Sequence, residues 1–251
     1  MRSCAIHQPN LLPRLSTLAK LYAADVWVVL DDVQFVRRDY QHRARLAGLH
    51  RPEQCRWLSV ETHLPYGRAT LIREARLVDP SRAARRLSQL PAQHYRLSGY
   101  WPSLQAALQP AVQAVTETGG TASVAESTTR ALLNVLDWRG SIVHSSDLAA
   151  SSDRSARLAD LTRAVGADTY LCGTGGMRYL DRSPFAERGL SVHALRPPSS
   201  EGLWTGAATV SALWALAAYG PRNVKAAFDE FLTARVPHAS GPLARTGRGG
   251  R

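Results

Sequence analysis

Two adjacent carboxylates, Asp31 and Asp32, directly follow the continuous apolar run at residues 26–30 (VWVVL). Neighbouring side chains on an extended chain point to opposite sides, so one carboxylate can face a site while the other forms a cap or an ion pair. A carboxylate in a site can hold a metal ion, orient an amine or act as a general base. The alternative is a solvated strand end with a salt bridge, and the sequence leaves both interpretations open.

A basic stretch that contains an aromatic residue comes next along the chain. Four arginines fall between Arg37 and Arg45, and guanidinium groups bind phosphate or carboxylate through paired hydrogen bonds. The candidate substrate-binding residues here are Gln34, Arg38, Tyr40, His42, Arg43 and Arg45. The same charges could instead form a solvated face.

Polar side chains also follow the first apolar segment, residues 3–7 (SCAIH). His7, Gln8 and Asn10 surround Pro9, ahead of a predicted helix. In parallel sheets, ligands bind beyond the carboxyl ends of strands, beside the free amides of helix N-termini. His7 is therefore a candidate catalytic residue, and Gln8 and Asn10 are candidate substrate-binding residues. The prolines of this stretch could equally serve only to shape the connection.

A glycine-rich loop lies within residues 170–180 (YLCGTGGMRYL). Gly173, Gly175 and Gly176 would let a ligand approach the backbone amides closely, although their spacing matches neither a dinucleotide-binding fingerprint nor a P-loop. Cys172 could be a nucleophile, but we interpret it as a buried strand residue because the sequence supplies no positioned base. Ser146, in HSSD at another predicted strand end, could add a hydroxyl group.

These stretches fall at the ends of predicted strands that alternate with helices. The expected strands and extended segments are residues 3–7, 26–30, 41–60 (around a turn at Gly48), 141–146, 168–172 and 190–196. The expected helices are residues 14–23, 80–90, 102–117, 123–136, 152–165, 176–188, 206–219 and 221–234. Strands that alternate with helices through short connections favour a parallel sheet.

We therefore expect an α/β fold with a mainly parallel sheet flanked by helices. Residues 1–235 are predicted to form a single α/β domain with a helical insert near 80–137. Asp79-Pro80 is a good start for that insert, with an N-cap followed by proline at the first helical position. Residues 236–251 are predicted to be a flexible basic tail.

The composition is that of a folded globular protein, with 45% apolar and 20% charged residues. The formal net charge of +11 comes mostly from arginine, since Lys20 and Lys225 are the only lysines. No groove-reading motif accompanies this charge, so nucleic acid is not expected as the main partner. The chain lacks the roughly 18-residue apolar run of a membrane span. It also lacks a secretion signal, which predicts a cytoplasmic protein with no membrane partner.

The three cysteines, Cys4, Cys55 and Cys172, form no CxxC motif and are far apart. The sequence therefore indicates neither a zinc site nor a disulfide framework.

Taken together, these stretches resemble the WbqC-like family of bacterial proteins. The matching segments are residues 6–13 (IHQPNLLP), 24–46 (ADVWVVLDDVQFVRRDYQHRARL), 145–148 (SSDL) and 157–181 (RLADLTRAVGADTYLCGTGGMRYLD). The residues that match the family pattern are Gln8, Pro9, Asp31, Asp32, Gln34, Arg43, Gly175, Gly176, Tyr179 and Leu180. His42 stands where asparagine is usual, Arg14 where tryptophan is common, and Trp214 where an aspartate would fall.

The resemblance implies a biosynthetic role, in pathways for surface polysaccharides or secondary metabolites. Some members are thought to attach an amino acid or another acyl group to an amino sugar. We accordingly predict a transferase or ligase that forms an amide bond between an acyl or aminoacyl group and an amine.

In this hypothesis Asp31 or Asp32 binds or deprotonates the attacking amine. His7, Gln8 and the amides of residues 173–176 stabilise the oxyanion or phosphates. Arg38, Arg43 and Arg45 hold the anionic part of the donor. The expected partners are small-molecule substrates, and the donor is either ATP with Mg²⁺ or the phosphopantetheine of an acyl or peptidyl carrier protein.

Two alternatives remain open at this stage. The first 30 residues also resemble α/β nucleotidyltransferases of the HUP-like type and adenylate-forming amide ligases, so an enzyme that uses a nucleoside triphosphate and Mg²⁺ is the first alternative. The second is a non-catalytic module that binds anions or nucleic acid, and steep salt dependence of binding would favour it.

Overall fold

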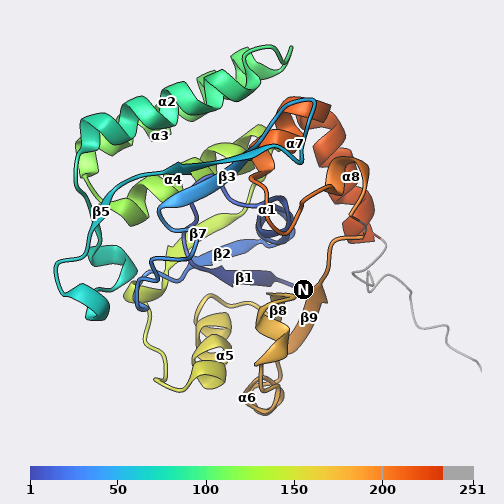
Figure 1. Ribbon diagram of the computed structural model, residues 1–251. Helices are drawn as coiled ribbons and strands as arrows, with labels where there is room; N and C mark the ends of the chain where they lie inside the picture. The colour runs from blue at the N-terminus through green and yellow to red at the C-terminus, as the bar shows by residue number, and fades with distance from the viewer. Residues whose placement is uncertain (199, 234–251) are drawn as a thin grey trace, which may run out of the picture.

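A five-stranded parallel sheet lies at the centre of the computed structural model, which describes residues 1–198 and 200–233. Its strands, drawn as arrows in Figure 1, are β1 (Ser3–His7), β2 (Val26–Val29), β7 (Ser141–His144), β8 (Thr169–Gly173) and β9 (Ser191–Leu195). Their spatial order is β7-β2-β1-β8-β9. The predicted α/β class with a mainly parallel sheet is confirmed.

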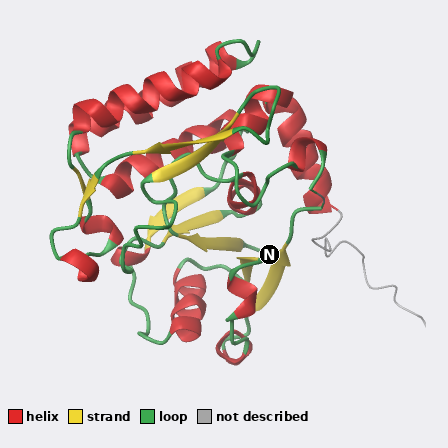
Figure 2. Cartoon of the chain, in the orientation of Figure 1, coloured by secondary structure: helices red, strands yellow, loops and turns green. Residues whose placement is uncertain are grey.

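Both faces of this sheet are buried, which explains the continuous apolar runs in its strands. Trp27 and Val29 of β2 belong to the larger hydrophobic core, whereas the alternating Val26 and Val28 belong to a second core. The larger core contains residues of α1 (Leu15–Tyr22), α4 (Thr121–Val135), α7 (Ala212–Tyr219) and α8 (Pro221–Thr233). The second core contains residues of α5 (Arg154–Ala164) and α6 (Ser183–Glu187). Figure 2 shows these helices on both sides of the sheet.

The order in which strands are added to the sheet reverses at β1. The chain first adds β2 and then β7 on one side of β1, and it later adds β8 and then β9 on the other side. Neighbouring parallel strands at such a switch point open a crevice beyond their carboxyl ends. His7 ends β1 and Gly173 ends β8, so the His7 loop and the glycine-rich loop both lie at this crevice.

Three helices form over the stretch in which a helical insert was predicted. α2 (Pro80–Tyr95) and α3 (Trp101–Thr118) lie away from the sheet, at the top of Figure 1. Like α4, they contribute buried residues to the larger core. Asp79 is the N-cap of α2, since its side chain accepts a hydrogen bond from the Arg82 amide at 2.8 Å. The predicted start of the insert is therefore correct.

Two short antiparallel pairs connect β2 to the insert. β3 (Arg43–Ala47) pairs with β4 (Cys55–Ser59), which confirms the extended segments predicted around Gly48. β5 (Thr62–His63) then pairs with β6 (Arg76–Leu77).

Three predicted helices have the wrong bounds. The helix predicted over 80–90 continues to Tyr95, because α2 accommodates Pro91 in its interior. Residues 176–188 form one 3-10 turn (Gly176–Arg178) and the separate α6, because a proline stands in the first turn of α6 and favours a new helix start there. The helix predicted over 206–219 begins only at Ala212. Gly206 has a φ of 64°, and Ser211 caps α7 through its hydroxyl group.

The predicted basic tail at residues 236–251 lies outside the described residues. Within the part of the chain that is described, no helix combines the length and the apolar character needed to cross a bilayer.

Candidate active site

A cavity of about 580 Å³ lies at the crevice between β1 and β8, and we call it the switch-point cavity. The lining residues that matter for chemistry are His7, Gln8, Arg14, Lys20, Cys172 and the loop at 173–176. Of the predicted site residues, the cavity thus brings together His7, Gln8, Gly173, Gly175 and Gly176.

The charge of this lining is strongly unbalanced. Arg14, Lys20 and Arg154 contribute three cations, and Asp39 is the single carboxylate among the lining residues. A cleft lined by one sign of charge concentrates ligands of the opposite sign. The switch-point cavity therefore suits an anionic ligand.

His7 lies where β1 ends, and its imidazole has a defined tautomer. Nδ1 lies 2.7 Å from the carbonyl oxygen of Gln8. A carbonyl oxygen only accepts hydrogen bonds, so Nδ1 carries the proton in the neutral ring and Nε2 keeps its lone pair. Burial lowers the pKa of His7 well below its ordinary value, and the charges of Lys20 and Arg14 lower it further. His7 is therefore a neutral imidazole at neutral pH, with a nitrogen able to take a proton.

Lys20 is a buried cation in the last turn of α1, with only 6% of its surface exposed. Its Nζ donates a hydrogen bond to the carbonyl oxygen of Ile6 at 3.3 Å. Burial lowers the pKa of Lys20 to about 8, and Arg14 acts in the same direction. The residue thus stays mainly protonated at pH 7 in a place where a cation is costly.

Arg14 enters the cavity from the residue before α1. Its Nη1 donates to the carbonyl oxygen of Ala208 at 3.1 Å, and its guanidinium group lies 4.4 Å from the centre of the Tyr40 ring. Its Nε is buried and finds no hydrogen-bond acceptor among the described residues. The arginine is therefore positioned by its outer nitrogen while an inner N–H stays available.

The glycine-rich loop packs tightly against Cys172. A Cβ at Gly176 would lie 2.7 Å from the Cys172 sulfur, whereas a Cβ at Gly175 would meet nothing within 4 Å. Gly173 is close to the stem of Lys20, since a Cβ there would lie 3.8 Å from Cδ of that lysine. Burial raises the pKa of the Cys172 thiol. The thiol is thus protonated at neutral pH, in keeping with a buried strand residue.

The twin carboxylates lie at the same edge of the sheet but outside the lining of the switch-point cavity. Asp31 is buried and accepts hydrogen bonds from the amide and the hydroxyl group of Ser146, at 3.1 and 2.9 Å. Asp32 lies 2.5 Å from the hydroxyl group of Ser145 and 2.5 Å from Nη2 of Arg157. These five residues form an acid cluster that ties the end of β2 to the end of β7 and to α5.

Removing the charge of Asp32 is expected to destabilise the fold. Although burial alone raises the pKa of Asp32, hydrogen bonds from Ser145 and Arg157 lower it below 3.8. The folded state therefore favours the carboxylate, which stabilises the protein above pH 3.8 and less as the pH falls through the lowered value. We expect Asp32→Asn to reduce the free energy of unfolding at pH 7 by about 1–3 kcal/mol, because it leaves Arg157 without its anion.

Urea unfolding at pH 7 measures this effect, and Asp147→Asn is the matched control. Asp147 follows β7, the strand that pairs with β2, but its side chain is 72% exposed, so its replacement should change stability by less than about 0.5 kcal/mol. Equal stabilities for Asp32→Asn and the unmutated protein would contradict a structural role for the acid cluster.

The arginine-rich stretch flanks the switch-point cavity without lining it, except through Asp39. The Tyr40 ring contacts Arg14 and also the half-exposed Trp57, whose ring centre is 5.9 Å away. Arg43 lies over the Trp57 ring, 4.5 Å from its centre. The Arg43 side chain also donates to the backbone oxygens of Arg38 and Asp39. Arg38 itself is exposed, and Arg45 lies on β3.

The remaining predicted site residues also lie outside the lining. Asn10 is 2% exposed, the Gln34 side chain donates to the Arg68 carbonyl at 2.6 Å, and His42 packs against Phe35 with ring centres 5.4 Å apart. Burial lowers the pKa of His42 to about 4. Tyr179 is 67% exposed and lies under Arg154.

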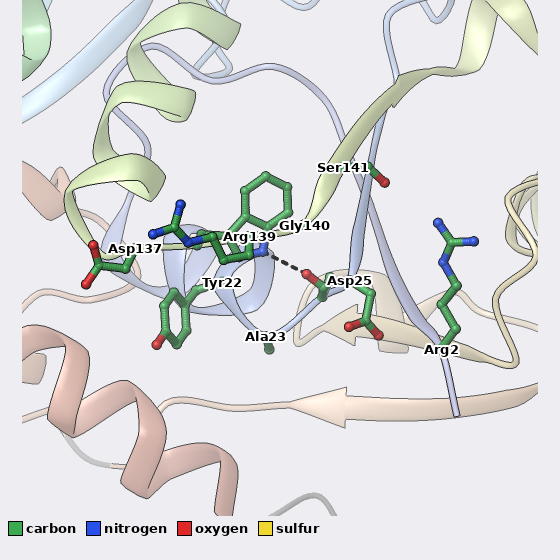
Figure 3. A pocket seen from close by; sticks show the side chains of 10 residues that line it. Arg2, Tyr22, Ala23, Asp25, Asp137, Arg139, Gly140 and Ser141 are labelled. Carbon is green, nitrogen blue, oxygen red and sulfur yellow. Dashed lines mark hydrogen bonds between the residues drawn. The ribbon is translucent and has the colours of Figure 1, made fainter.

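A second cavity of similar volume opens at the opposite edge of the sheet and is shown in Figure 3. Its acids are paired within the chain. Asp25 accepts from the amide and the hydroxyl group of Ser3, at 2.7 and 2.9 Å, and Asp137 pairs with Lys225 at 3.1 Å. Parallel sheets bind ligands at their carboxyl edge, so we take the switch-point cavity as the candidate site. No group of three or more His, Cys, Asp or Glu suited to a metal ion occurs among the residues described.

Three cationic residues of the cavity, and the carboxylate Asp39, were missed as site candidates. Lys20 had a usable signal, because it is one of two lysines in an arginine-rich chain and interrupts the apolar helix at residues 15–22. Arg14 was visible only as a departure from the family pattern. Arg154 carries no local signal, since its contribution depends on where α5 packs.

The chain was also compared with known proteins. The model of the WbqC-like protein family matches residues 8–216, which is most of the chain. No curated protein and no solved structure matches.

Proposed function

The chain belongs to the WbqC-like protein family, and from this premise and the geometry of the cavity we propose an enzyme that forms an amide bond. It would transfer an acyl or aminoacyl group to an amine, such as that of an amino sugar, in a biosynthetic pathway. The observation that carries the proposal is a neutral histidine, His7, that shares one cavity with two cations, the buried Lys20 and the partly buried Arg14.

This combination meets the two requirements of amide formation. An ammonium ion has no lone pair, so the attacking amine must lose a proton, and Nε2 of His7 can accept it. Negative charge develops on the carbonyl oxygen of the donor as the amine attacks, and a buried ammonium or backbone amides of the 173–176 loop can stabilise it. The cavity thus has a base and a group that stabilises the oxyanion.

The proposed step conserves atoms and charge. The amine nitrogen forms a C–N bond with the acyl carbon, and the bond from that carbon to the leaving sulfur or oxygen breaks. His7 first takes the proton that an ammonium substrate carries and releases it to solvent; the proton that the amine nitrogen loses as the C–N bond forms then passes to His7 and on to the leaving group. In this scheme His7 replaces the twin acids as the base, because both carboxylates are engaged in the acid cluster.

The test is product formation by the purified full chain. Panels of amino sugars and other amines are incubated with acyl thioesters of phosphopantetheine, or with carboxylic acids and ATP, and products are identified by mass spectrometry. We expect a product whose mass equals acyl donor plus amine minus the leaving group. The absence of any condensed product from folded protein across both donor classes would reject the proposal.

The strand order favours one second candidate, a nucleotidyltransferase that uses NTP. The chain order in the sheet, with a reversal between β1 and β8, is that of doubly wound nucleotide-binding sheets. Such an enzyme releases pyrophosphate from a nucleoside triphosphate and a phosphorylated acceptor, without any amine. Pyrophosphate release that needs no amine would favour this candidate over amide formation.

A further inference from the structure

The buried ammonium of Lys20 has fewer acceptors than donors. It carries three N–H bonds, and the one hydrogen bond found for it goes to the Ile6 carbonyl at 3.3 Å. No carboxylate among the described residues forms a salt bridge with it. A buried charge without a counter-ion is strongly unfavourable, which points to an anion that completes the site.

Arg14, in the same cavity, also has an N–H donor without an acceptor. Its buried Nε has no acceptor, although its outer Nη1 is held by the Ala208 carbonyl. The guanidinium group also lies over the Tyr40 ring, with its carbon 4.4 Å from the ring centre, and this contact restricts its position. Lys20 and Arg14 therefore offer N–H groups that are already positioned and desolvated, and such groups bind anions with little further ordering.

The loop at 173–176 lines the same cavity as Lys20 and Arg14. It passes next to the stem of Lys20, and Gly175 leaves open space beside its backbone. The cavity volume of about 580 Å³ far exceeds that of a single phosphate and falls in the range of sites for whole small ligands. With three cations against one carboxylate, the lining has a net charge that matches a dianion better than a single carboxylate.

From these observations we infer that the switch-point cavity is a phosphoryl-binding site in which Lys20 and Arg14 bind the phosphate oxygens. This inference rests on the proposed function and names the class of its donor, one that carries a phosphoryl group. It moves the anion from the exposed arginine-rich stretch, where the sequence placed it, to the interior of the fold.

The presence of only two lysines makes a direct test possible. Protein labelled with ¹³C at lysine Cε should show two lysine signals, and Lys225→Arg assigns them. Lys225 pairs with Asp137 at 3.1 Å outside the switch-point cavity, so it is an internal control. Inorganic phosphate and pyrophosphate are titrated at constant ionic strength, with acetate as the carboxylate arm.

We expect phosphate or pyrophosphate to shift the Lys20 signal to saturation and to leave Lys225 unchanged. The pH midpoint of Lys20 should also rise when pyrophosphate is bound, because an adjacent anion favours the ammonium form. Lys20→Met and Arg14→Met should each weaken pyrophosphate binding, measured by calorimetry, by about tenfold or more, and Lys225→Met should not. Separate titrations with ATP and with 4'-phosphopantetheine distinguish the two sources, because only the donor that enters the cavity should shift the Lys20 signal.

A Lys20 signal that ignores phosphate and pyrophosphate, or that responds equally to acetate, would overturn the inference. The Lys20 titration uses the unmutated protein and needs no reaction, so its result stands even if a variant fails to fold. It also separates the two hypotheses. Phosphate binding without any amide product would reject the proposed function alone, and amide formation with a silent Lys20 would reject this inference alone.

Discussion

Replacing His7 by glutamine is expected to slow amide formation by about 10²–10⁴-fold, the usual contribution of a positioned general base. The reason is specific to Nε2. The Gln8 carbonyl holds the proton on Nδ1 at 2.7 Å, so the ring offers its lone pair at the other nitrogen. A glutamine amide fills much of the same space but cannot take a proton at neutral pH. The rate is measured with the donor and amine that give product in the unmutated protein.

The pH profile tests the same residue independently. Burial, followed by the charge of Lys20, lowers the pKa of His7 well below 6.5, so the neutral base persists as the pH falls through 6.5. The acid limb of kcat is therefore expected below pH 6.5. Lys20→Met removes one of the charges that disfavour imidazolium, so any activity that remains in this variant should show an acid limb shifted to higher pH.

Two further variants separate a catalytic His7 from a structural one. His7→Ala leaves space in the cavity, and added imidazole should restore part of its activity, which a purely structural role would not allow. His63→Gln replaces an exposed histidine on β5 and should retain full activity. A His7→Gln variant within twofold of the unmutated rate would show that another group takes the proton.

The fold class was predictable from the sequence because its strands carry patterns that are typical of a parallel sheet between helices. The run VWVV is buried at every position, and a strand covered on both faces belongs to a parallel sheet between helices. The helical insert was equally clear, because Asp79-Pro80 marks its start. Helix bounds failed where a proline, Pro184, or a left-handed glycine, Gly206, divides a stretch that otherwise resembles a helix.

The candidate site was only partly predictable, because residue type indicates what a side chain can do and packing decides what it meets. His7 and the glycine-rich loop sit at strand ends, where the parallel-sheet rule places ligands. Asp31 also follows a strand, yet β7 lies on the outer side of β2 and presents Ser145 and Ser146 to it. No local pattern could show that these serines, more than a hundred residues away, would engage the carboxylate.

Lys20 is the opposite case, a residue of the cavity that was not predicted to belong to the site. A lysine at the end of an apolar helix normally extends its charge to solvent, and here it is buried against the Ile6 carbonyl. The reason is that α1 packs across the switch point, so the last turn of the helix faces the crevice between β1 and β8. This depends on the strand order, which the sequence did not determine.

Gly140→Ala is expected to cause a large loss of stability. A Cβ at this position would lie 2.1 Å from Cζ2 of Trp138 and 2.7 Å from the backbone oxygen of Asp25. The indole cannot move away freely, since its Nε1 donates to the Ala24 carbonyl at 2.8 Å. Figure 3 shows Gly140 close to Asp25.

A shift of the backbone at Gly140 could not relieve the clash without cost either. Ser141 donates its amide to the same Asp25 oxygen at 2.9 Å, and this hydrogen bond starts the pairing of β7 with β2. Moving Gly140 outward would break that hydrogen bond. We expect the free energy of unfolding to fall by about 3 kcal/mol, at the upper end for overpacking, and the melting temperature by about 10 °C.

Thermal and urea unfolding measure the change, with Gly99→Ala as the control because a Cβ there would meet nothing within 4 Å. The effect should also reach the carboxyl edge of the sheet. β7 carries Ser145 and Ser146 to the acid cluster, so a displaced β7 would loosen Asp31 and Asp32, and the further loss from adding Asp32→Asn should become smaller than in the unmutated background. Full additivity of the two substitutions, or a Gly140→Ala protein as stable as Gly99→Ala, would contradict the view that this glycine sets the position of β7.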